Sequence, residues 1–248
     1  SGSWIQKGIM YVGSQKSGSG GVVVRGGGFQ PQTEVRIASA AGASGFLTVT
    51  NTTLILTNSS STVYAGHSGS GTLDIIDSTM SFPAILYVAN AAGATGSVHL
   101  VDSDVTNRTS LIVGNTAGSF GSIAQSGGRL TVTDYFRLPA NGTGAYLAND
   151  AVFSGKWVTI AAYGTGSTAI GRVDLSGTQR VFRVSVSLAI GTQGVGSITN
   201  RVAQYAGGID LVESTATLTV GGTGNIHIAF EEDPVELGMY WGLRWKGD

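Results

Sequence analysis

Apolar and polar residues alternate along most of the chain, and the alternation restarts behind a regularly spaced glycine. Nine such glycines, which we call the marker glycines, stand at positions 20, 45, 71, 96, 121, 144, 171, 196 and 224, giving intervals of 25, 26, 25, 25, 23, 27, 25 and 28 residues. A repeat of this length is typical of a solenoid, in which one repeat buries its apolar face only by stacking on copies of itself.

Each repeat begins with a strand that has one buried face. The positions two and four residues after each marker glycine are mostly apolar and those between them mostly polar, which is the period of a half-buried strand. The first column is Val22, Leu47, Leu73, Val98, Ile123, Tyr146, Val173, Ile198 and Ile226. The second is Val24, Val49, Ile75, Leu100, Gln125, Ala148, Leu175, Asn200 and Ile228.

A corner and two further strands complete the repeat. Six residues after the marker glycine come residue types that tolerate a left-handed backbone and favour turns. They are Gly26, Asn51, Asp77, Asp102, Gly127, Asp150 and Gly177. The inward face of a second strand follows at Phe29, Leu54, Met80, Val105, Leu130 and Phe153. A third stretch ends in a β-branched residue plus Gly or Ala, as in Val12-Gly13 and Val113-Gly114.

Strand, corner, strand, loop and strand in about 25 residues form one coil of a parallel β-helix. We therefore predict an all-β fold, a single-stranded, right-handed parallel β-helix (β-solenoid) of about nine coils, roughly 45 Å long at ~4.8 Å per coil. Propeller blades need about 40 residues and leucine-rich repeats need their own Leu/Asn spacing. A sandwich would not hold its register over so many units, and no helical period of useful length occurs outside the C-terminal region.

Two polar residues, Gln125 and Asn200, interrupt the apolar columns. Each either hydrogen-bonds within the core or marks a local shift of register. We expect the first for Gln125. Asn200 lies in the longest repeat, where a shift is plausible.

The two ends differ from the middle of the chain. We divide it into a β-helix over residues 1–230 and a C-terminal segment over 231–248, which is rich in charged and aromatic residues and contains Pro234. An open coil end is a sheet edge that templates further pairing, so this segment is expected to cap the edge or, alternatively, to dock another subunit. The N-terminal end has no capping helix and is expected to stack on a partner. The candidate assembly residues are Trp4, Tyr240, Trp241, Arg244 and Trp245.

The amino-acid composition excludes some classes of function and structure. Apolar residues make up 42% and charged residues 12%, and the 39 glycines fall between apolar runs, where we expect them to form turns. The net charge of −1 with scattered basic residues argues against a nucleic-acid surface. The absence of cysteine excludes disulfides and thiolate metal sites, and no apolar run approaches the ~20 residues of a membrane span. The chain opens on Ser1-Gly2-Ser3, which indicates a processed product, an excised fragment or a tag remnant.

The glycine-punctuated repeats resemble the passenger regions of bacterial autotransporters and related secreted adhesins. The similarity spans roughly residues 9 to 230 and is clearest from Leu111-Ile112-Val113-Gly114-Asn115 to Gly127-Gly128-Arg129-Leu130-Thr131-Val132. The resemblance implies a β-helix that is secreted and displayed at a cell surface. It implies little about activity, since this architecture hosts adhesins, fibres, toxins and enzymes. The chain contains no membrane-barrel segment, so any anchor would lie outside it.

Few residues suggest chemistry. Asp74 and His99 occupy the same outward position on adjacent coils, so their side chains should lie about 5 Å apart, and we interpret them as a polar pair on a solvated face. Asp77, Asp102 and Asp104 could ligate calcium, which needs six to eight oxygens, but turn geometry alone accounts for them. We predict no catalytic residues, no cofactor and no metal.

Carbohydrate chemistry is the alternative that the sequence leaves open. Lyases and hydrolases with this fold cluster acidic residues with Arg or Lys in a groove, whereas Arg108, Arg129 and Arg172 lie in different repeats without an evident acidic partner. Aromatic platforms for sugars could come from Tyr135, Phe136, Tyr146 and Tyr163, although Tyr146 is expected in the core.

These observations favour a non-catalytic, extracellular or bacterial cell-surface module with a structural or adhesive role. We expect self-association through the coil ends, end to end into a fibre or surface layer, or binding to another surface protein or to glycans. We expect neither nucleic-acid binding nor membrane insertion. The alternative is a carbohydrate-active enzyme or a carbohydrate-binding module on the same scaffold.

Overall fold

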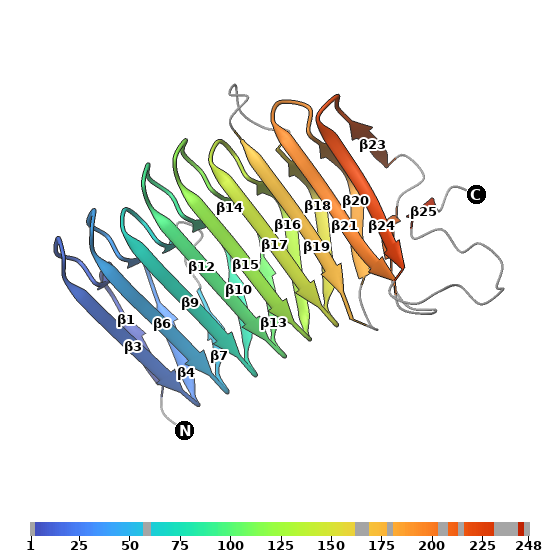
Figure 1. Cartoon of the computed structure of the whole chain (residues 1–248). Helices are drawn as coiled ribbons and strands as arrows, with labels where there is room; N and C mark the ends of the chain where they lie inside the picture. Colours follow the sequence, from blue (N-terminus) through green and yellow to red (C-terminus); the bar gives the residue numbers. More distant parts are fainter. Residues whose placement is uncertain are drawn as a thin grey trace.

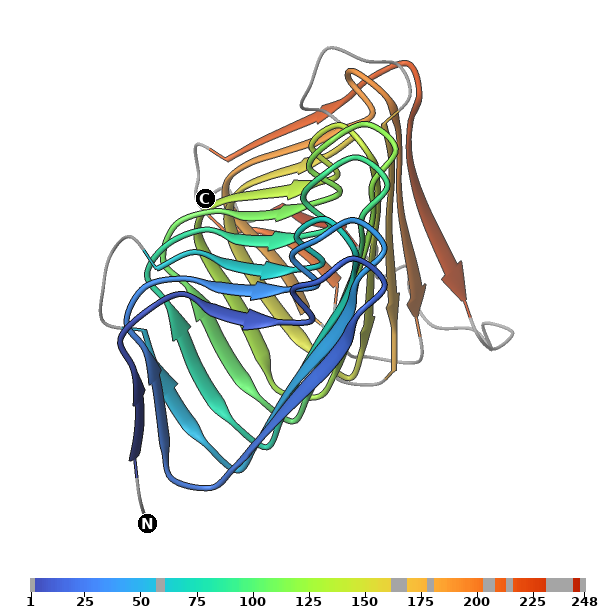
Figure 2. The ribbon, with the colours of Figure 1, turned by 90° about the vertical axis from the view of Figure 1, so that its left-hand side faces the viewer.

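A computed structural model describes residues 3–56, 61–161, 169–177, 181–202, 208–212, 216–230 and 243–245. These residues form a parallel β-helix, seen from the side in Figure 1 and from the N-terminal end in Figure 2. One flank is a nine-stranded parallel sheet, which we call sheet B; its nine strands delimit eight turns. The fold class predicted from the repeat is confirmed. Within the described ranges, no helix is long and apolar enough to cross a membrane.

Sheet B contains the strand that follows each marker glycine. Its strands are β3 (Ser19–Arg25), β6 (Ser44–Thr50), β9 (Ser70–Ile76), β12 (Thr95–Val101), β15 (Phe120–Ser126), β17 (Thr143–Asn149), β19 (Ile170–Ser176), β21 (Val195–Val202) and β24 (Gly224–Phe230).

The 16-stranded sheet A forms the other two flanks. The second strands of the early coils are β1 (Ser3–Gln6), β4 (Gly28–Pro31), β7 (Thr53–Ile55), β10 (Thr79–Phe82) and β13 (Asp104–Asn107). The third strands of these coils are β2 (Met10–Val12), β5 (Val35–Ile37), β8 (Val63–Ala65), β11 (Leu86–Val88) and β14 (Leu111–Val113). The remaining strands are β16 (Arg129–Leu138), β18 (Val152–Ile160), β20 (Val181–Ile190), β22 (Gly208–Leu211), β23 (Thr217–Val220) and β25 (Leu243–Trp245).

The later coils depart from the predicted three separate strands. In β16, β18 and β20 the second and third strands join into one long strand, and the register shifts between Val132 and Tyr135 and between Gly155 and Trp157. In two earlier coils, Pro31 ends β4 and Pro83 follows β10. Proline lacks the N–H that a ladder needs, which explains the break in these two coils, although β13 and β14 are also separate strands without a proline between them.

The register of sheet B follows the marker glycines without a slip. Gly20 pairs with Gly45, and each later marker glycine pairs with the next as far as Gly224. Leu73, Val98 and Ile123 are therefore stacked on successive coils. Of the two alternatives for Asn200, the register shift does not occur, because Asn200 pairs with Leu175 and Ile228.

The predicted corners are also confirmed. All seven corner residues have positive φ angles, from 45° at Asp102 to 91° at Gly177. A second left-handed position follows most third strands, for example at Ala38 with φ 56° and Ala89 with φ 62°, whereas Pro139 follows β16. Asn and Asp tolerate this conformation better than other residues with a Cβ, so the corner aspartates have a structural role.

The marker glycines themselves do not form turns, contrary to our expectation. Each belongs to a sheet B strand, and in the interior coils it points inward. A Cβ on Gly96 would collide with the carbonyl oxygen of Ala65 in the preceding coil and the amide nitrogen of Ala89 in its own coil. The glycine is required because another backbone segment occupies the space of a side chain.

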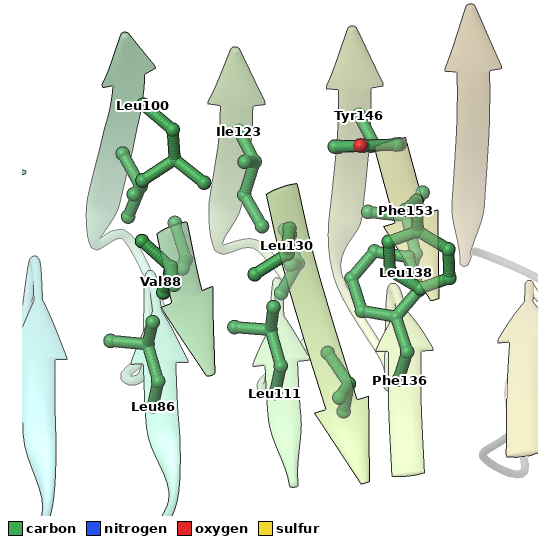
Figure 3. Close-up of a cluster of buried hydrophobic side chains, with 14 of the residues drawn as sticks. Leu86, Val88, Leu100, Leu111, Ile123, Leu130, Phe136, Leu138, Tyr146 and Phe153 are labelled. Carbon is green, nitrogen blue, oxygen red and sulfur yellow. The ribbon is translucent and has the colours of Figure 1, made fainter. Parts of the chain in front are cut away.

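The core is a set of like-on-like columns of buried residues, and Figure 3 shows part of it in close-up. Leu100, Ile123 and Tyr146 extend inward from successive sheet B strands and face residues of sheet A such as Leu130 and Phe136. The later coils hold an aromatic cluster in which ring centroids lie 4.4 to 6.3 Å apart. Its members are Phe136, Tyr146, Phe153 and Phe182.

The predicted hydrogen bonding of Gln125 within the core is confirmed. The Tyr146 hydroxyl donates to Gln125 Oε1 at 2.6 Å, and Gln125 Nε2 donates to the carbonyl oxygen of Gly127 at 3.2 Å. Burial raises the pKa of the Tyr146 phenol, so the hydroxyl keeps its proton and remains a donor. A polar residue is tolerated in this column because the next coil supplies its partner.

Candidate functional site

The outer face of sheet B brings together the predicted pair of Asp74 and His99. His99 Nδ1 lies 2.8 Å from Asp74 Oδ1, and Thr48 of the preceding coil donates its hydroxyl to Asp74 Oδ2 at 3.0 Å. The His99 side chain is 50% exposed. Among the hydrogen bonds of the described residues, none joins His99 to a serine or threonine hydroxyl. The geometry matches a cross-strand polar ladder and lacks the hydroxyl neighbour that a nucleophilic triad requires.

A shallow depression of about 520 Å³ lies beside this ladder. It forms because Ala124 is small, while His99 precedes it and Leu147 follows it in the same outward column. At the far end, Arg172 Nη2 lies 2.6 Å from Asp174 Oδ2. Our expectation that Arg172 lacks an acidic partner is therefore wrong. The two residues are two apart on one strand and so share a face, a signal that the sequence did contain.

A second outward column runs along the third strands and was missed in the sequence. Tyr11, Arg36, Tyr64 and Tyr87 pair in register on successive coils. The Tyr64 and Tyr87 rings stack with centroids 5.1 Å apart and planes 7° apart, and the guanidinium of Arg36 lies 5.8 Å from the Tyr11 ring and 5.9 Å from the Tyr64 ring. Cations at such distances are attracted by the ring quadrupole. Each of these four residues directly precedes the last residue of its third strand. This shared position is the sequence feature from which the column could have been predicted.

Titratable groups surround this column. Arg36 Nη2 lies 2.8 Å from Glu34 Oε2, and this bond raises the pKa of Arg36. The pKa of Tyr64 is raised, chiefly by burial and then by the charge of Glu34. His67 meets the Tyr64 ring edge-on at 4.7 Å, and its Nδ1 lies 2.9 Å from Ser68 Oγ. Burial lowers the pKa of His67.

The predicted aromatic platforms divide into surface and core. Tyr135 stacks outside on Trp157 with centroids 4.8 Å apart, while Phe136 and Tyr146 are fully buried. The prediction that Phe136 could form a surface platform is therefore wrong, and the prediction that Tyr146 lies in the core is confirmed. Tyr163 lies outside the described residues.

The acidic corner residues do not converge on a metal site in the described ranges. There, no three His, Cys, Asp or Glu side chains gather closely enough to hold an ion. Asp77 and Asp102 occupy left-handed corners with φ of 48° and 45°. Asp104 begins β13 with its side chain exposed.

The candidate assembly residues lie at the two ends. Trp4 is on β1, 42% exposed, with its ring 4.8 Å from that of the fully buried Phe29. Arg244 and Trp245 belong to β25, whose backbone pairs in parallel with β22. Their side chains, and all of Tyr240 and Trp241, lie outside the described residues, as does the predicted C-terminal segment apart from residues 243–245.

The fold defines the chain as a parallel β-helix repeat protein. Comparison with protein-family models, with curated proteins and with solved structures gave no match.

Proposed function

We propose that this protein is a non-catalytic, extracellular structural or adhesive module whose coils associate end to end. The observation that carries the proposal is the unequal burial of the same columns at the N-terminal coil and in the interior. Val22 and Val24 are only partly buried, whereas Leu47 and Val49 on the next coil are 2% and 0% exposed. Among the described residues, no further coil stacks on these apolar core positions of the first coil.

The edge strands support the same proposal. β1, β2 and β3 are terminal strands of their sheets among the described residues, and edge strands carry unpaired backbone groups that template pairing. Because all the ladders are parallel, the last coil of one copy has the strand direction that the first coil of another requires. Such a head-to-tail contact does not close on itself and yields filaments. The cysteine-free composition and the repeats similar to autotransporter passengers favour a place at a bacterial cell surface.

Association is tested by sedimentation velocity and electron microscopy over a rising concentration series. We expect the wild-type protein to form lengthening particles and Val24→Lys, which places a charge on the open end of the core, to remain monomeric. Val23→Lys is the matched control, because Val23 is on the same strand but 50% exposed on the outer face. A wild-type protein that stays monomeric at high concentration, or equal behaviour of the two variants, contradicts the proposal.

One observation favours a second candidate, a carbohydrate-active enzyme. The imidazole of His99, positioned by Asp74, stands at the rim of the depression in sheet B. We expect no cleavage when the protein is incubated with a panel of acidic and neutral polysaccharides. Turnover that is lost in Asp74→Asn or His99→Gln would replace the structural proposal with the enzymatic one.

A further inference from the structure

The outer face of the third strands combines aromatic rings with basic side chains over several coils. We call it the basic–aromatic face and define it by Arg36, Tyr64, Tyr87, Tyr135, Arg137, Lys156 and Trp157. All seven side chains are partly exposed. The face lies on a different flank from the sheet B depression and does not involve the coil ends.

The cations of this face are held by the rings beside them. Lys156 Nζ lies 4.1 Å from the Trp157 ring centroid, and the guanidinium of Arg137 lies 4.8 Å from that of Tyr135. Tyr135 in turn stacks on Trp157 at 4.8 Å. Contacts of this kind restrict long side chains, so less conformational entropy is lost when a ligand binds them.

Charge is segregated toward this flank. Among the described residues, five cations and two carboxylates lie on the third strands between β2 and β18 or within three residues before them. The cations are Lys7, Arg36, Arg108, Arg137 and Lys156, and the carboxylates are Glu34 and Asp134. Around the corner that follows sheet B the balance is reversed, with Asp77, Asp102, Asp104 and Asp150 against Arg25 and Arg129. The flank therefore complements an anionic partner, although the net charge of the whole chain is −1.

We propose that the basic–aromatic face binds an anionic polysaccharide that lies across successive coils. Arginine donors suit carboxylate and sulfate groups, and tyrosine hydroxyls at the ring edges suit sugar hydroxyls. The stacking argues against a single-stranded nucleic acid, whose bases need open ring faces. Arg36 of the preceding coil lies over one face of the Tyr64 ring and Tyr87 of the following coil over the other.

Affinity measurements at low salt test this proposal with four probes: polygalacturonate, dextran sulfate, neutral dextran and a thymidine oligonucleotide. We expect the wild-type protein to bind a polyanionic polysaccharide and not neutral dextran. Binding to either polyanion supports the proposal, and the tighter of the two identifies carboxylate or sulfate as the recognised group. Binding to neither polyanion, or tighter binding of the oligonucleotide than of both, overturns it.

A charge-matched pair of double variants locates the site. Arg137→Gln with Lys156→Gln should weaken binding about tenfold or more, the loss of roughly one charge-assisted contact. Arg25→Gln with Arg129→Gln removes the same charge at exposed positions on the other flanks and should change affinity less than about twofold. Thermal unfolding of each variant verifies its fold. Equal losses in the two pairs would show general electrostatic attraction and overturn the assignment to this face.

Discussion

The first coil and the interior coils are built from the same sequence pattern but differ in burial. Val98 in the interior is 1% exposed, while Val22, at the same column position, is only partly buried. The aromatic residue of the first coil in the second-strand column, Trp4, is 42% exposed, whereas Phe29 one coil later is 0% exposed. In these two columns the first coil depends on a neighbouring coil for burial, whereas Met10 and Val12 on its third strand are already 6% and 2% exposed.

This difference in burial separates the positions that stabilise the fold from those that are available for association. Interior positions gain burial from two neighbours, so their substitution should cost the most. The first coil has one neighbour among the described residues, and its remaining apolar surface is available to a partner. Substitutions at equivalent positions of the first and interior coils therefore test this difference.

The largest effect is expected at the marker glycines. Gly96→Ala should destabilise the protein by on the order of 3–5 kcal/mol, because its Cβ would meet backbone atoms of two coils. Gly20→Ala in the first coil should cost less, about 1–2 kcal/mol, since its Cβ would meet only its own coil, at Gly13 N, 2.8 Å away. Urea unfolding midpoints measure both, with Gly8→Ala as a control in open space. Equal costs at Gly20 and Gly96 would refute the explanation.

The next largest effect on stability is expected at two valines that occupy the same column, Val98 in an interior coil and Val22 in the first coil. Val98→Ala leaves a cavity between two coils and should cost about 2 kcal/mol, whereas Val22→Ala, at a half-covered position, should cost less than about 1 kcal/mol. Denaturant titrations under conditions that keep the protein monomeric give the two values. A Val22 variant as unstable as the Val98 variant would mean that the first coil is already fully covered.

The third largest effect on stability is expected from the hydrogen bond between Tyr146 and Gln125 in the core. Tyr146→Phe leaves Gln125 Oε1 without its 2.6 Å donor and should cost about 1–2 kcal/mol. Adding Gln125→Leu should recover part of this loss, because both partners are then apolar. A double-mutant cycle by thermal unfolding measures the coupling free energy, and a coupling near zero would show that the contact contributes nothing.

The smallest effect lies outside the core, at His67. Because burial lowers its pKa, the folded state binds the proton less readily than the unfolded state does. The free energy of unfolding should be highest above the ordinary histidine pKa of about 6.5 and should decrease as the pH falls through that value. His67→Gln should reduce this decrease in a series of unfolding midpoints from neutral to mildly acidic pH. An unchanged pH dependence in the variant would exclude His67 as its source.

The sequence predicted the inner columns and the corners because both recur at fixed distances from the marker glycines. It could not explain the glycines themselves, since the reason for Gly96 is contact with Ala65 and Ala89, and such contacts appear only once coils are stacked. The merging of strands in β16 was missed because alternation alone does not reveal where a strand bends.

The candidate site was predicted only in part. Asp74 and His99 were paired correctly because both lie close behind a marker glycine. The stack of Tyr64 and Tyr87 was not predicted. The connection between the second and third strands varies in length, so the third strand does not begin at a fixed distance from the marker glycine. The partner of Arg172 was not predicted because Asp174 lies on the same strand, whereas the other polar pair, Asp74 and His99, joins adjacent coils.

Amide hydrogen exchange, followed by mass spectrometry at low and high protein concentration, puts the stacking account to its hardest test. At low concentration, amides in β12 and β15 should exchange slowly and those in β3 should exchange fast. At high concentration, β3 should become protected while β12 and β15 remain unchanged. Protection of β3 equal to that of β12 in the dilute protein, or no response of β3 to concentration, would contradict the claim that each coil depends on its neighbours for burial.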